Sequence, residues 1–475
     1  MKPLSPSLAS LVPLAAALLL SGCASLLPPA GTPYSAPEVT VPATWSTAGT
    51  AAAAKTTAST PADAGWSAFG DPALTRWVDT ALERNADIAT TVLRLQRAGW
   101  QAQMQDIRLP VSASLSSGQS RSLSGGLGSP SSSASSSFGV SYEADLWGKV
   151  ARQQDAARWT AQATAQDLAS ARLTVASGAA TLYWQIASLQ AQAADARLAL
   201  DNARRALTLV QAQHKAGAVG ALELAQAQQA VQAAQVSQSQ IASQLQQAST
   251  SAALLMDTAP DGLQGLQALG LPVPQGWPKM TLPAVQPDLP AQVLARRPDL
   301  QAAELRLRAS WASADVTRLS YYPSLSLTGR LGFAGSALLD LLANPVATLG
   351  AGLSLPFLNA GQMNLDLKVA QNQYAEAVNT YRQTLYTALG EVADALEQRR
   401  QLQRQGELQA ASLAQAQTVS RVSEARYRAG SVALKTWLDA QDALRSARAS
   451  LRANELARLS NHATLIQALG GPAAS

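Results

Sequence analysis

A phrase near the middle of this 475-residue chain returns near its end. Residues 214–231 read HKAGAVGALELAQAQQAV, and residues 427–444 read YRAGSVALKTWLDAQDAL. Both pass through Ala-Gly and a short apolar turn into an acidic, Gln-containing helix start. Their glycines, Gly217 and Gly430, are separated by an offset of 213 in the numbering, so the phrase belongs to a repeat of half the chain.

The same offset of 213 holds far beyond the phrase itself. It relates the pairs Pro110/Pro323, Ser141/Ser354, Gly148/Gly361 and Gln228/Gln441. Upstream, NADI and RPDL correspond at an offset of 212. We therefore predict an internal duplication, with a first repeat at residues 66–259, a linker at 260–289 and a second repeat at 290–475.

Each repeat contains a stretch in which apolar and polar residues alternate. Val111, Ala113 and Leu115 alternate with serines, and after a Ser/Gly-rich loop the alternation returns from Phe138 to Leu146. Period two with one apolar side predicts a β-hairpin. We place one hairpin at 110–147 and the other at 323–358, which gives four strands per chain.

Long helices are predicted on both sides of each phrase, after an upstream helix that begins at Asp71-Pro72 and runs to about Arg108. Apolar residues step by three and four from Leu182 to Val210, and again from Tyr374 to Ala395. The distance along the chain from Gly148 to Gly217 equals that from Gly361 to Gly430, at 69 positions. Each arm would be about 100 Å long if wholly helical, so both turns are expected at the same far end.

The N-terminus reads MKPLSPSLASLVPLAAALLLSGCAS, which is typical of a secretory signal peptide at residues 1–22. Leu-Ser-Gly-Cys resembles a bacterial lipobox, which implies cleavage before Cys23 and a diacylglycerol and N-acyl chain (palmitate among them) on its sulfur and amine. Ala24 resembles the sorting pattern of outer-membrane lipoproteins. Residues 23–65, rich in Pro, Ala, Thr and Ser, are predicted to be an extended tether.

Composition excludes several classes of function. Loss of Lys2 lowers the formal charge from +5 to +4, and no dense basic tract suggests nucleic acid. Cys23 is the only cysteine, and the two histidines, His214 and His462, are far apart. We therefore expect no metal site, no cofactor apart from the lipid, no catalytic triad and no enzyme activity. After the signal, no apolar run reaches the roughly 18 residues that a membrane-spanning helix needs, so no transmembrane helix is expected.

Four strands cannot close a barrel, and open sheet edges are not tolerated in lipid. A closed transmembrane barrel would need strands from several chains, and two, three or four copies would give 8, 12 or 16 strands. The alternative from the pattern alone is a small soluble sheet that caps a helical bundle.

Six segments, taken in order and in duplicate, resemble the outer-membrane factors, the TolC-like channel-tunnels, in their NodT-type lipoprotein branch. They are FGDPAL (69–74), SYEADLWGKV (141–150), RRPDLQAAELRL (296–307), YYPSLSLTG (321–329), RQTLYTALGEVADAL (382–396) and RAGSVALKTWLDAQ (428–441). The resemblance covers nearly the whole chain after the signal.

The resemblance implies a mainly α-helical homotrimer in outer-membrane lipid. Twelve strands would form a transmembrane β-barrel, continuous with a periplasmic barrel of twelve long helices. The protein would be the passive exit duct of a tripartite efflux system for drugs, solvents or metal ions. A periplasmic adaptor would join it to an inner-membrane transporter, most simply of the resistance-nodulation-division type.

The repeated phrase is then the periplasmic end that docks the adaptor. The residues implied are Lys215, Gly217, Arg428, Gly430 and Ser431, where Gly turns the chain, cations suit a helix C-terminus and Ser431 can cap the next helix. The same residues also make an ordinary, well-formed helical hairpin, and that interpretation stays open.

The resemblance also implies a gate, because acidic residues follow the turn glycine in such channels. Glu223 and Asp439 are the acids at these places, whereas Thr436 stands where relatives carry Asp. We predict a constriction that attracts cations. Lys435, at a position where the resemblance implies an apolar residue, opposes that attraction. The alternative is that these acids are solvated residues of helix first turns.

Other classes remain as rivals. A periplasmic adaptor-like lipoprotein also uses helical hairpins, but it would carry one hairpin flanked by small β domains. A purely structural envelope-spanning coiled coil is a further rival. A cell-wall hydrolase would need a cluster of catalytic side chains, which the sequence does not offer.

Overall fold

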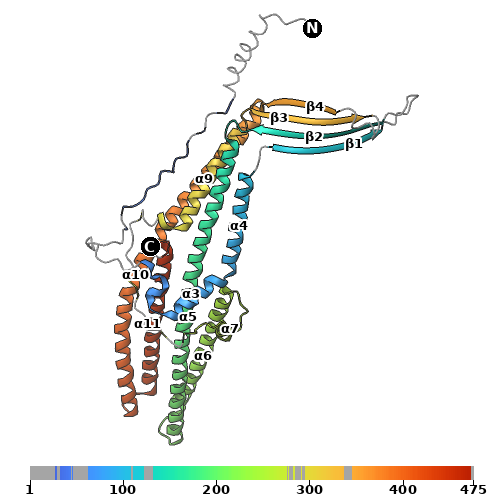
Figure 1. Cartoon of the computed structure of the whole chain (residues 1–475). Coiled ribbons are helices and arrows are strands. Elements are labelled where there is room, and N and C mark those ends of the chain that lie inside the picture. The colour runs from blue at the N-terminus through green and yellow to red at the C-terminus, as the bar shows by residue number, and fades with distance from the viewer. Residues whose placement is uncertain are drawn as a thin grey trace, which may run out of the picture. The chain divides into compact units, whose positions relative to one another are not determined.

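The structure of the chain is a computed structural model that describes most of both repeats (Figure 1). The described residues are 27–28, 31, 33–43, 45, 62–107, 111–121, 132–274, 277, 282–283, 290, 295–335 and 345–471. The predicted signal peptide and the Cys23 lipidation site lie outside these residues. So do the segments that connect the strands within each hairpin.

The chain divides into two compact units, and each unit takes segments from both repeats. One unit contains Leu95–Thr164 and Ala302–Arg382 with the N-terminal segment up to Glu38, and the other contains Val39–Arg94, Ala165–Gln301 and Gln383–Ser475. The duplication is therefore interleaved in space. We call the first the sheet unit and the second the helical unit.

Helices dominate the described residues, and the two repeats have matching elements. The first repeat contains α3 (Pro72–Arg84), α4 (Ala86–Asp106), α5 (Lys149–Lys215) and α6 (Ala221–Leu255). It is preceded by η2 (Ala62–Phe69), which begins in the predicted tether, and followed by α7 (Gly262–Ala268) in the predicted linker. The second contains α9 (Pro298–Leu319), η4 (Pro356–Leu358), α10 (Ala360–Arg428) and α11 (Leu434–Ala468). No helix in the described part of the chain is apolar over a stretch long enough to cross a bilayer.

The predicted heptad positions supply the helix contacts. In α5, the buried residues of the pattern are Ile186, Leu189, Ala196, Leu200 and Val210. In α10 they are Leu385, Ala388, Val392 and Ala395. Three of these nine residues are alanines, whose small side chains let helix backbones approach closely.

One prediction about the helices was wrong. The sequence suggested a single helix from Asp71-Pro72 to about Arg108, but the chain breaks at Asn85, between α3 and α4. The Asn85 side chain accepts from the Ile88 N–H at 3.0 Å and so caps α4. Its amide group donates to the Leu255 carbonyl at 2.8 Å. Asp71 does cap α3 as predicted, by accepting from Ala73 and Leu74.

The second repeat has an equivalent contact at the end of its returning helix. Buried Arg297 donates to the Ala468 carbonyl at 2.9 Å and to carboxylates of Asp299 and Glu391. Leu255 and Ala468, the last residues of α6 and α11, are 213 positions apart. Both repeats therefore use a buried polar side chain to satisfy the carbonyl end of the returning helix.

The main core lies in the helical unit. Trp77 and Val78 of α3 pack with Tyr183 and Trp184 of α5 and with Met256 beyond α6. The ring centroid of Phe69 in η2 lies 5.1 Å from those of both Trp184 and His462. The upstream helices thus pack against long helices of both repeats.

The four strands form one antiparallel sheet in the order β1-β2-β3-β4. They are β1 (Val111–Arg121), β2 (Ser132–Ala144), β3 (Ser324–Gly335) and β4 (Pro345–Ser354). The two hairpins predicted from alternation are confirmed, and β2 of the first repeat pairs with β3 of the second. The outer edges of β1 and β4 have no neighbouring strand among the described residues.

Candidate functional site

The two repeated phrases form the same turn. Gly217 and Gly430 both have φ of 73°, the left-handed conformation that favours glycine. Ala218 N–H donates to the Gln213 carbonyl and Gly217 N–H to the His214 carbonyl. Ser431 and Gly430 repeat these bonds to Arg426 and Tyr427. These are Schellman caps, so both glycines end long helices as predicted.

The two turns lie at the same end of the helical unit and contact each other (Figure 1). Leu434 and Trp437 of α11 are buried against Val210 of α5. Tyr427 stacks on Trp437 with ring centroids 5.1 Å apart, and its hydroxyl donates to Gln213 Oε1 at 3.0 Å. We call this set of residues the turn cluster, and it joins the ends of the two hairpins.

Tyr427 also interacts electrostatically with Glu223 of the first repeat. Burial raises the pKa of its phenol, and the nearby Glu223 carboxylate raises it further. Sequence reasoning quoted Tyr427 and Trp437 within the phrase but gave neither a role. The available signal was an aromatic residue on each side of the turn glycine, which the second copy carries and the first does not.

The cations of the turns are exposed to solvent. Lys215 lies in the last turn of α5 and Arg428 in that of α10. Arg428 pairs with Glu424 one helical turn earlier, at 2.6 Å. His214 spans the first turn, where its Nδ1–H donates to the Val219 carbonyl at 2.9 Å.

One of the predicted caps was wrong. Ser431 does not cap α11, whose N-cap is Ala433 without a side-chain hydrogen bond. Instead, the Ser431 hydroxyl donates to the Arg426 carbonyl at 3.1 Å and satisfies the end of α10. The turn between Gly430 and Leu434 leaves Ser431 too far back to reach the new helix.

Glu223 lies in the first turn of α6, and Lys435 and Thr436 lie in the first turn of α11, whereas Asp439 lies in the second turn of α11. The four gate candidates also differ in their partners. Glu223 accepts from the backbone N–H of Gly220 at 3.0 Å, which caps its own helix. Lys435 and Asp439 pair with each other at 2.8 Å on the exposed surface. Thr436 is exposed, and its backbone N–H donates to the Ala433 carbonyl. Within one chain, therefore, Glu223 and Asp439 are both already engaged.

The sheet has two chemically different faces. Directly opposed residues of antiparallel strands share a face. One face carries the paired rows Leu115–Phe138–Leu331 and Val111–Tyr142–Leu327, together with Leu349 and Leu353. These side chains are exposed in the single chain, Leu349 by 91%. The sheet therefore presents an uncovered apolar surface.

The opposite face is lined by serine and threonine. Ser116 and Ser137 share a hydrogen bond of 2.9 Å across β1 and β2, and Ser120 and Ser133 share one of 2.8 Å. On β3, the Ser326 hydroxyl donates to the Gly352 carbonyl at 3.3 Å. This hydroxyl lining matches the alternation predicted from the sequence, and it suits contact with water.

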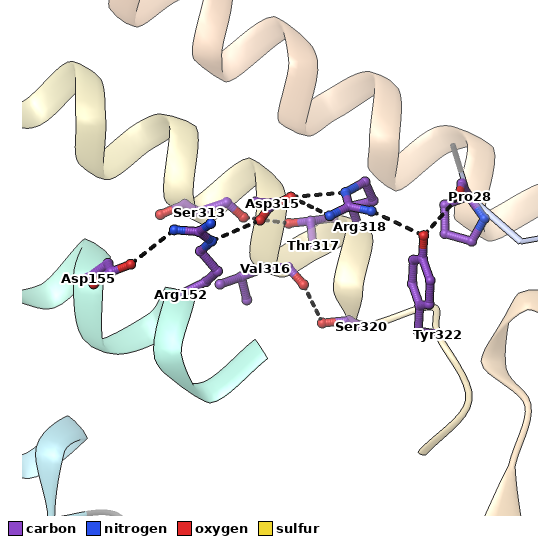
Figure 2. A network of polar contacts seen from close by, with 10 residues as sticks. All are labelled: Pro28, Arg152, Asp155, Ser313, Asp315, Val316, Thr317, Arg318, Ser320 and Tyr322. Atoms are coloured by element: carbon purple, nitrogen blue, oxygen red, sulfur yellow. Dashed lines mark hydrogen bonds and ion pairs between the residues drawn. The ribbon is translucent and has the colours of Figure 1, made fainter. Parts of the chain in front are cut away.

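The described part of the predicted tether lies against α9 in the sheet unit. Figure 2 shows Tyr322 donating to the Pro28 carbonyl at 3.2 Å while it accepts from Arg318 at 3.2 Å. Asp315 holds both Arg318, at 2.7 Å, and Arg152 of α5, at 3.2 Å. A Cβ at Gly31 would lie 2.7 Å from Asp315 Oδ1, so a larger residue there would displace the side chain of Asp315.

An aromatic contact continues this attachment. Tyr34 meets Trp311 of α9 edge-to-face at 6.0 Å, and Arg308 lies 5.3 Å from the centre of the Tyr34 ring. The described residues of the predicted tether from Pro28 to Tyr34 thus contact α9 and the residues directly after it. Sequence reasoning missed this because the contacts join residues almost 300 positions apart.

The sequence led us to expect that the chain holds no metal. No group of three His, Cys, Asp or Glu side chains in the described part of the chain could hold a metal ion. A cavity of about 460 Å³ lies at the start of α3, lined by Asp71, Arg76 and Asp79 among others. Asp71 there caps α3 and accepts from the Tyr183 hydroxyl, which is a structural role.

Comparison with known proteins identifies similar chains. The family model described as outer membrane efflux protein matches residues 77–256 and 289–471, which are the bodies of the two repeats. The pyoverdine export outer membrane protein OpmQ of Pseudomonas aeruginosa is 32% identical over 417 residues, covering 86% of each chain. The toluene efflux pump outer membrane protein TtgC of Pseudomonas putida is 31% identical over 466 residues, covering 96% of this chain and 94% of that one.

Solved structures show the same fold. The channel-forming protein CusC superposes with a TM-score of 0.81 at 25% identity, covering 93% of this chain and 99% of that one. A membrane protein from Pseudomonas aeruginosa gives the same score at 27% identity, covering 93% of this chain and 97% of that one.

Proposed function

The chain belongs to the outer membrane efflux protein family, and we propose that three copies form the passive exit duct of a tripartite efflux system. The duct carries small molecules such as drugs, solvents or metal ions out of the cell. A periplasmic adaptor and an inner-membrane transporter of the resistance-nodulation-division type deliver them. The relatives described above are efflux channels, and the chain needs no catalytic group for this task.

The observation that carries the proposal is the two-faced sheet with open edges. Its exposed apolar face suits lipid, and its hydroxyl-lined face suits water. The free edges of β1 and β4 cannot remain unpaired in a bilayer. Pairing β4 of one copy with β1 of the next satisfies both edges, and three copies then close a barrel of twelve strands.

The long helices and the turns give the duct its periplasmic part. α5, α6, α10 and α11 of three copies supply twelve helices for a tunnel. The exposed turns around Gly217 and Gly430 dock the adaptor, with Lys215, Arg428 and Ser431 at their surface. Acylated Cys23 anchors the chain in the outer membrane, and the segment seated on α9 leads away from that anchor.

The gate lies at the N-terminal ends of α6 and α11. Three copies would place three Glu223 and three Asp439 carboxylates around the mouth, together with Lys435 and Thr436. Because Asp439 is paired with Lys435, its charge is largely offset, whereas Glu223 has no cationic partner among the described ion pairs while it caps α6. Glu223 is therefore the stronger contributor to cation attraction.

The gate is tested by recording single channels of the Glu223→Gln/Asp439→Asn variant and of each single variant. Glu223→Gln should weaken cation preference and block by multivalent cations more than Asp439→Asn does. Lys435→Gln, which frees Asp439, should strengthen both. Equal cation preference in the wild type and all four variants would remove these residues from the gate.

The duct itself is tested with the purified, lipidated protein and with a deletion strain. We expect trimers that resist SDS without heating, ion conductance in planar bilayers, and mass-spectrometric evidence of acyl chains on Cys23. Deletion should raise sensitivity to some drugs, solvents or metal salts, and the wild-type gene should restore resistance. A monomeric, non-conducting protein would instead favour the adaptor-like or structural lipoprotein.

A further inference from the structure

The hydroxyl-lined face of the sheet carries a single basic residue near its centre, Arg330 of β3, among the residues that the structure describes. We propose that Arg330 makes this section of the duct select anions, so that three guanidinium groups favour cargo bearing carboxylate or phosphate groups. The inference rests on the proposed function, because it needs three copies closed around a water-filled lumen. It assigns to the sheet a selectivity opposite to that proposed for the turns.

The strand register places Arg330 on the hydroxyl face. Arg330 lies directly opposite Gly139 on β2 and Thr348 on β4. Ser326 and Thr328, whose hydroxyls donate to β4 carbonyls, lie on the same side of β3 at intervals of two residues. With the leucine face toward lipid, the Arg330 side chain belongs to the lumen.

No charged side chain in the described part of the sheet neutralises Arg330. Its neighbours on the same face are small or uncharged: Gly139 and Thr348 directly opposite, Ser137, Ser141, Val346 and Gly350 diagonally, and Thr328 and Gly332 along β3. The side chain is exposed. Among the described residues, no hydrogen bond or ion pair ties its guanidinium to the protein.

Glu143, the other charged residue on this face among the residues that the structure describes, is too distant to neutralise Arg330. Glu143 lies opposite Ser326, four residues along β3 from Arg330. At about 3.3 Å per residue the two rows are about 13 Å apart. This exceeds the screening length of about 10 Å in 0.1 M salt. Three copies therefore form two separate rings, with Glu143 at the end of the sheet near α5 and Arg330 at its middle.

The chemistry of the guanidinium indicates the class of cargo. Its planar set of donors matches carboxylate and phosphate oxygens, often in pairs. A water-filled lumen weakens each contact, so the ring acts on passage and does not hold the cargo tightly. The hydroxyls around it are uncharged, and those of Ser137 and Thr328 are already hydrogen-bonded to a serine and to a carbonyl. They give neutral, polar surroundings in which the charge of Arg330 is not offset.

The size of the effect follows from Coulomb's law. Three unit charges on the order of 10 Å from a passing ion in water, screened by 0.1 M salt, change its local concentration about twofold. Anions gain and cations lose, so the anion-to-cation permeability ratio changes about fourfold. In 1 M salt the screening length falls to about 3 Å and the effect should vanish.

The experiment measures reversal potentials of single channels in a potassium chloride gradient, at low and at high salt. Arg330→Ser places the residue typical of this face, and it should lower the chloride-to-potassium permeability ratio about fourfold at 0.1 M. Arg330→Lys keeps the charge and should keep the ratio. Glu143→Gln is the matched control of opposite sign and should raise it.

A second measurement uses sodium tripolyphosphate as a probe of the three Arg330 guanidinium groups. Its block of potassium chloride current should weaken about tenfold in Arg330→Ser, because the several negative charges of the probe multiply the local effect. The Arg330→Lys channel should be blocked like the wild type. A poorly assembled serine variant is replaced by Arg330→Gln, which keeps a long polar side chain.

The outcomes separate the two proposals. A wild-type protein that forms no channel overturns the duct and, with it, this inference. A conducting wild type whose permeability ratio and tripolyphosphate block are unchanged by Arg330→Ser or Arg330→Gln leaves the duct intact and overturns the anion-selecting ring.

Discussion

The two long hairpins, α5/α6 and α10/α11, have turns of the same conformation and helices of nearly the same length. They differ in the side chains that they bury. At the repeat offset of 213, Ile186, Ala248 and Ser249 of the first correspond to Arg399, Asn461 and His462 of the second. The first hairpin packs mainly apolar side chains here, whereas the second has larger polar ones, of which Asn461 and His462 are buried and Arg399 is half-buried. One backbone geometry is therefore held by two different kinds of interaction.

The polar side chains of the second hairpin form a ladder between its helices. Asn461 donates to the Ala395 carbonyl at 3.1 Å, and Asn454 donates to the Leu402 carbonyl at 3.0 Å. Arg399 Nη1 donates to His462 Nδ1 at 3.0 Å. Gly406 makes room for Asn454, because a Cβ there would lie 2.7 Å from its Oδ1. The first hairpin has Ala193 and Ile241 at these two positions.

The ladder fixes register more than it adds stability. Within the described residues, the buried Oδ1 atoms of Asn454 and Asn461 have no hydrogen-bond partner. An unsatisfied buried acceptor costs about 1–3 kcal/mol, which offsets the bonds made by the amide group. Directional bonds to single carbonyls nonetheless exclude a sliding of α11 along α10, which apolar packing alone resists less.

The largest expected difference between the repeats is in the stability contributed by Arg297 and Asn85, the buried side chains that donate to the carbonyl ends of α11 and α6. Arg297→Ala should lower the free energy of unfolding by about 3 kcal/mol, because it strands the Ala468 carbonyl and the carboxylates of Asp299 and Glu391. Asn85→Ala should cost about 1–2 kcal/mol. Thermal unfolding in detergent, followed by circular dichroism, ranks the variants by their loss of stability. Arg297→Lys, which keeps the charge alone, should fall between them, and equal losses would contradict the comparison.

The second difference is a dependence on pH that only the second hairpin should show. Burial, and then the charge of Arg399, lowers the pKa of His462 to about 4. Between about pH 6.5 and pH 4 the unfolded chain binds a proton that the folded chain does not, so stability falls with decreasing pH. The loss is up to about 3 kcal/mol.

His462→Gln should remove this part of the pH dependence and leave the stability at pH 7.5 nearly unchanged. Unfolding is measured at pH 7.5, 6 and 4.5 for the wild type and the variant. Ser249→Ala, at the equivalent position of the first hairpin, should leave the slope as it is. Parallel pH profiles for wild type and His462→Gln would show that His462 is not the source.

The smallest difference should be at the turns, where the two repeats agree. Gly217→Ala and Gly430→Ala should each cost about 1 kcal/mol, because Ala is strained at a φ of 73° although no atom crowds its Cβ. Gly178→Ala, inside α5 in open space, should stabilise by about 1 kcal/mol. Unfolding temperatures check the three variants, and clearly unequal losses at the two turns would show that the caps are not equivalent.

Much of the fold was predictable from the sequence, because it follows from local patterns and from the repeat. The repeat offset of 213 located both turns, and alternation located all four strands and both faces of the sheet. Each of these signals depends on neighbours in sequence or on a repeated spacing. The family resemblance added the assembly, which a single chain cannot display.

Other features depend on contacts that no local pattern records. The break at Asn85 requires the Leu255 carbonyl, 170 residues away, as its partner. The attachment of the N-terminal segment near the end of α9 depends on the hydrogen bond from the Tyr322 hydroxyl to the Pro28 carbonyl. The turn cluster joins Gln213 to Tyr427. Ser431 was assigned to the wrong helix because a serine beside a turn can satisfy either the preceding carbonyls or the following N–H groups.

The hydrogen bond from Tyr427 to Gln213 also ties the lengths of the two repeats together. α6 and α11 have 35 residues each, and both arms end on matching caps. A heptad inserted into one arm alone would move its turn about 10 Å past the other and separate the turn cluster. Paired insertions, one heptad in each of the four long helices, would keep the turns in contact. A change in the length of this protein therefore requires the same number of residues to be added to, or removed from, the long helices of both repeats.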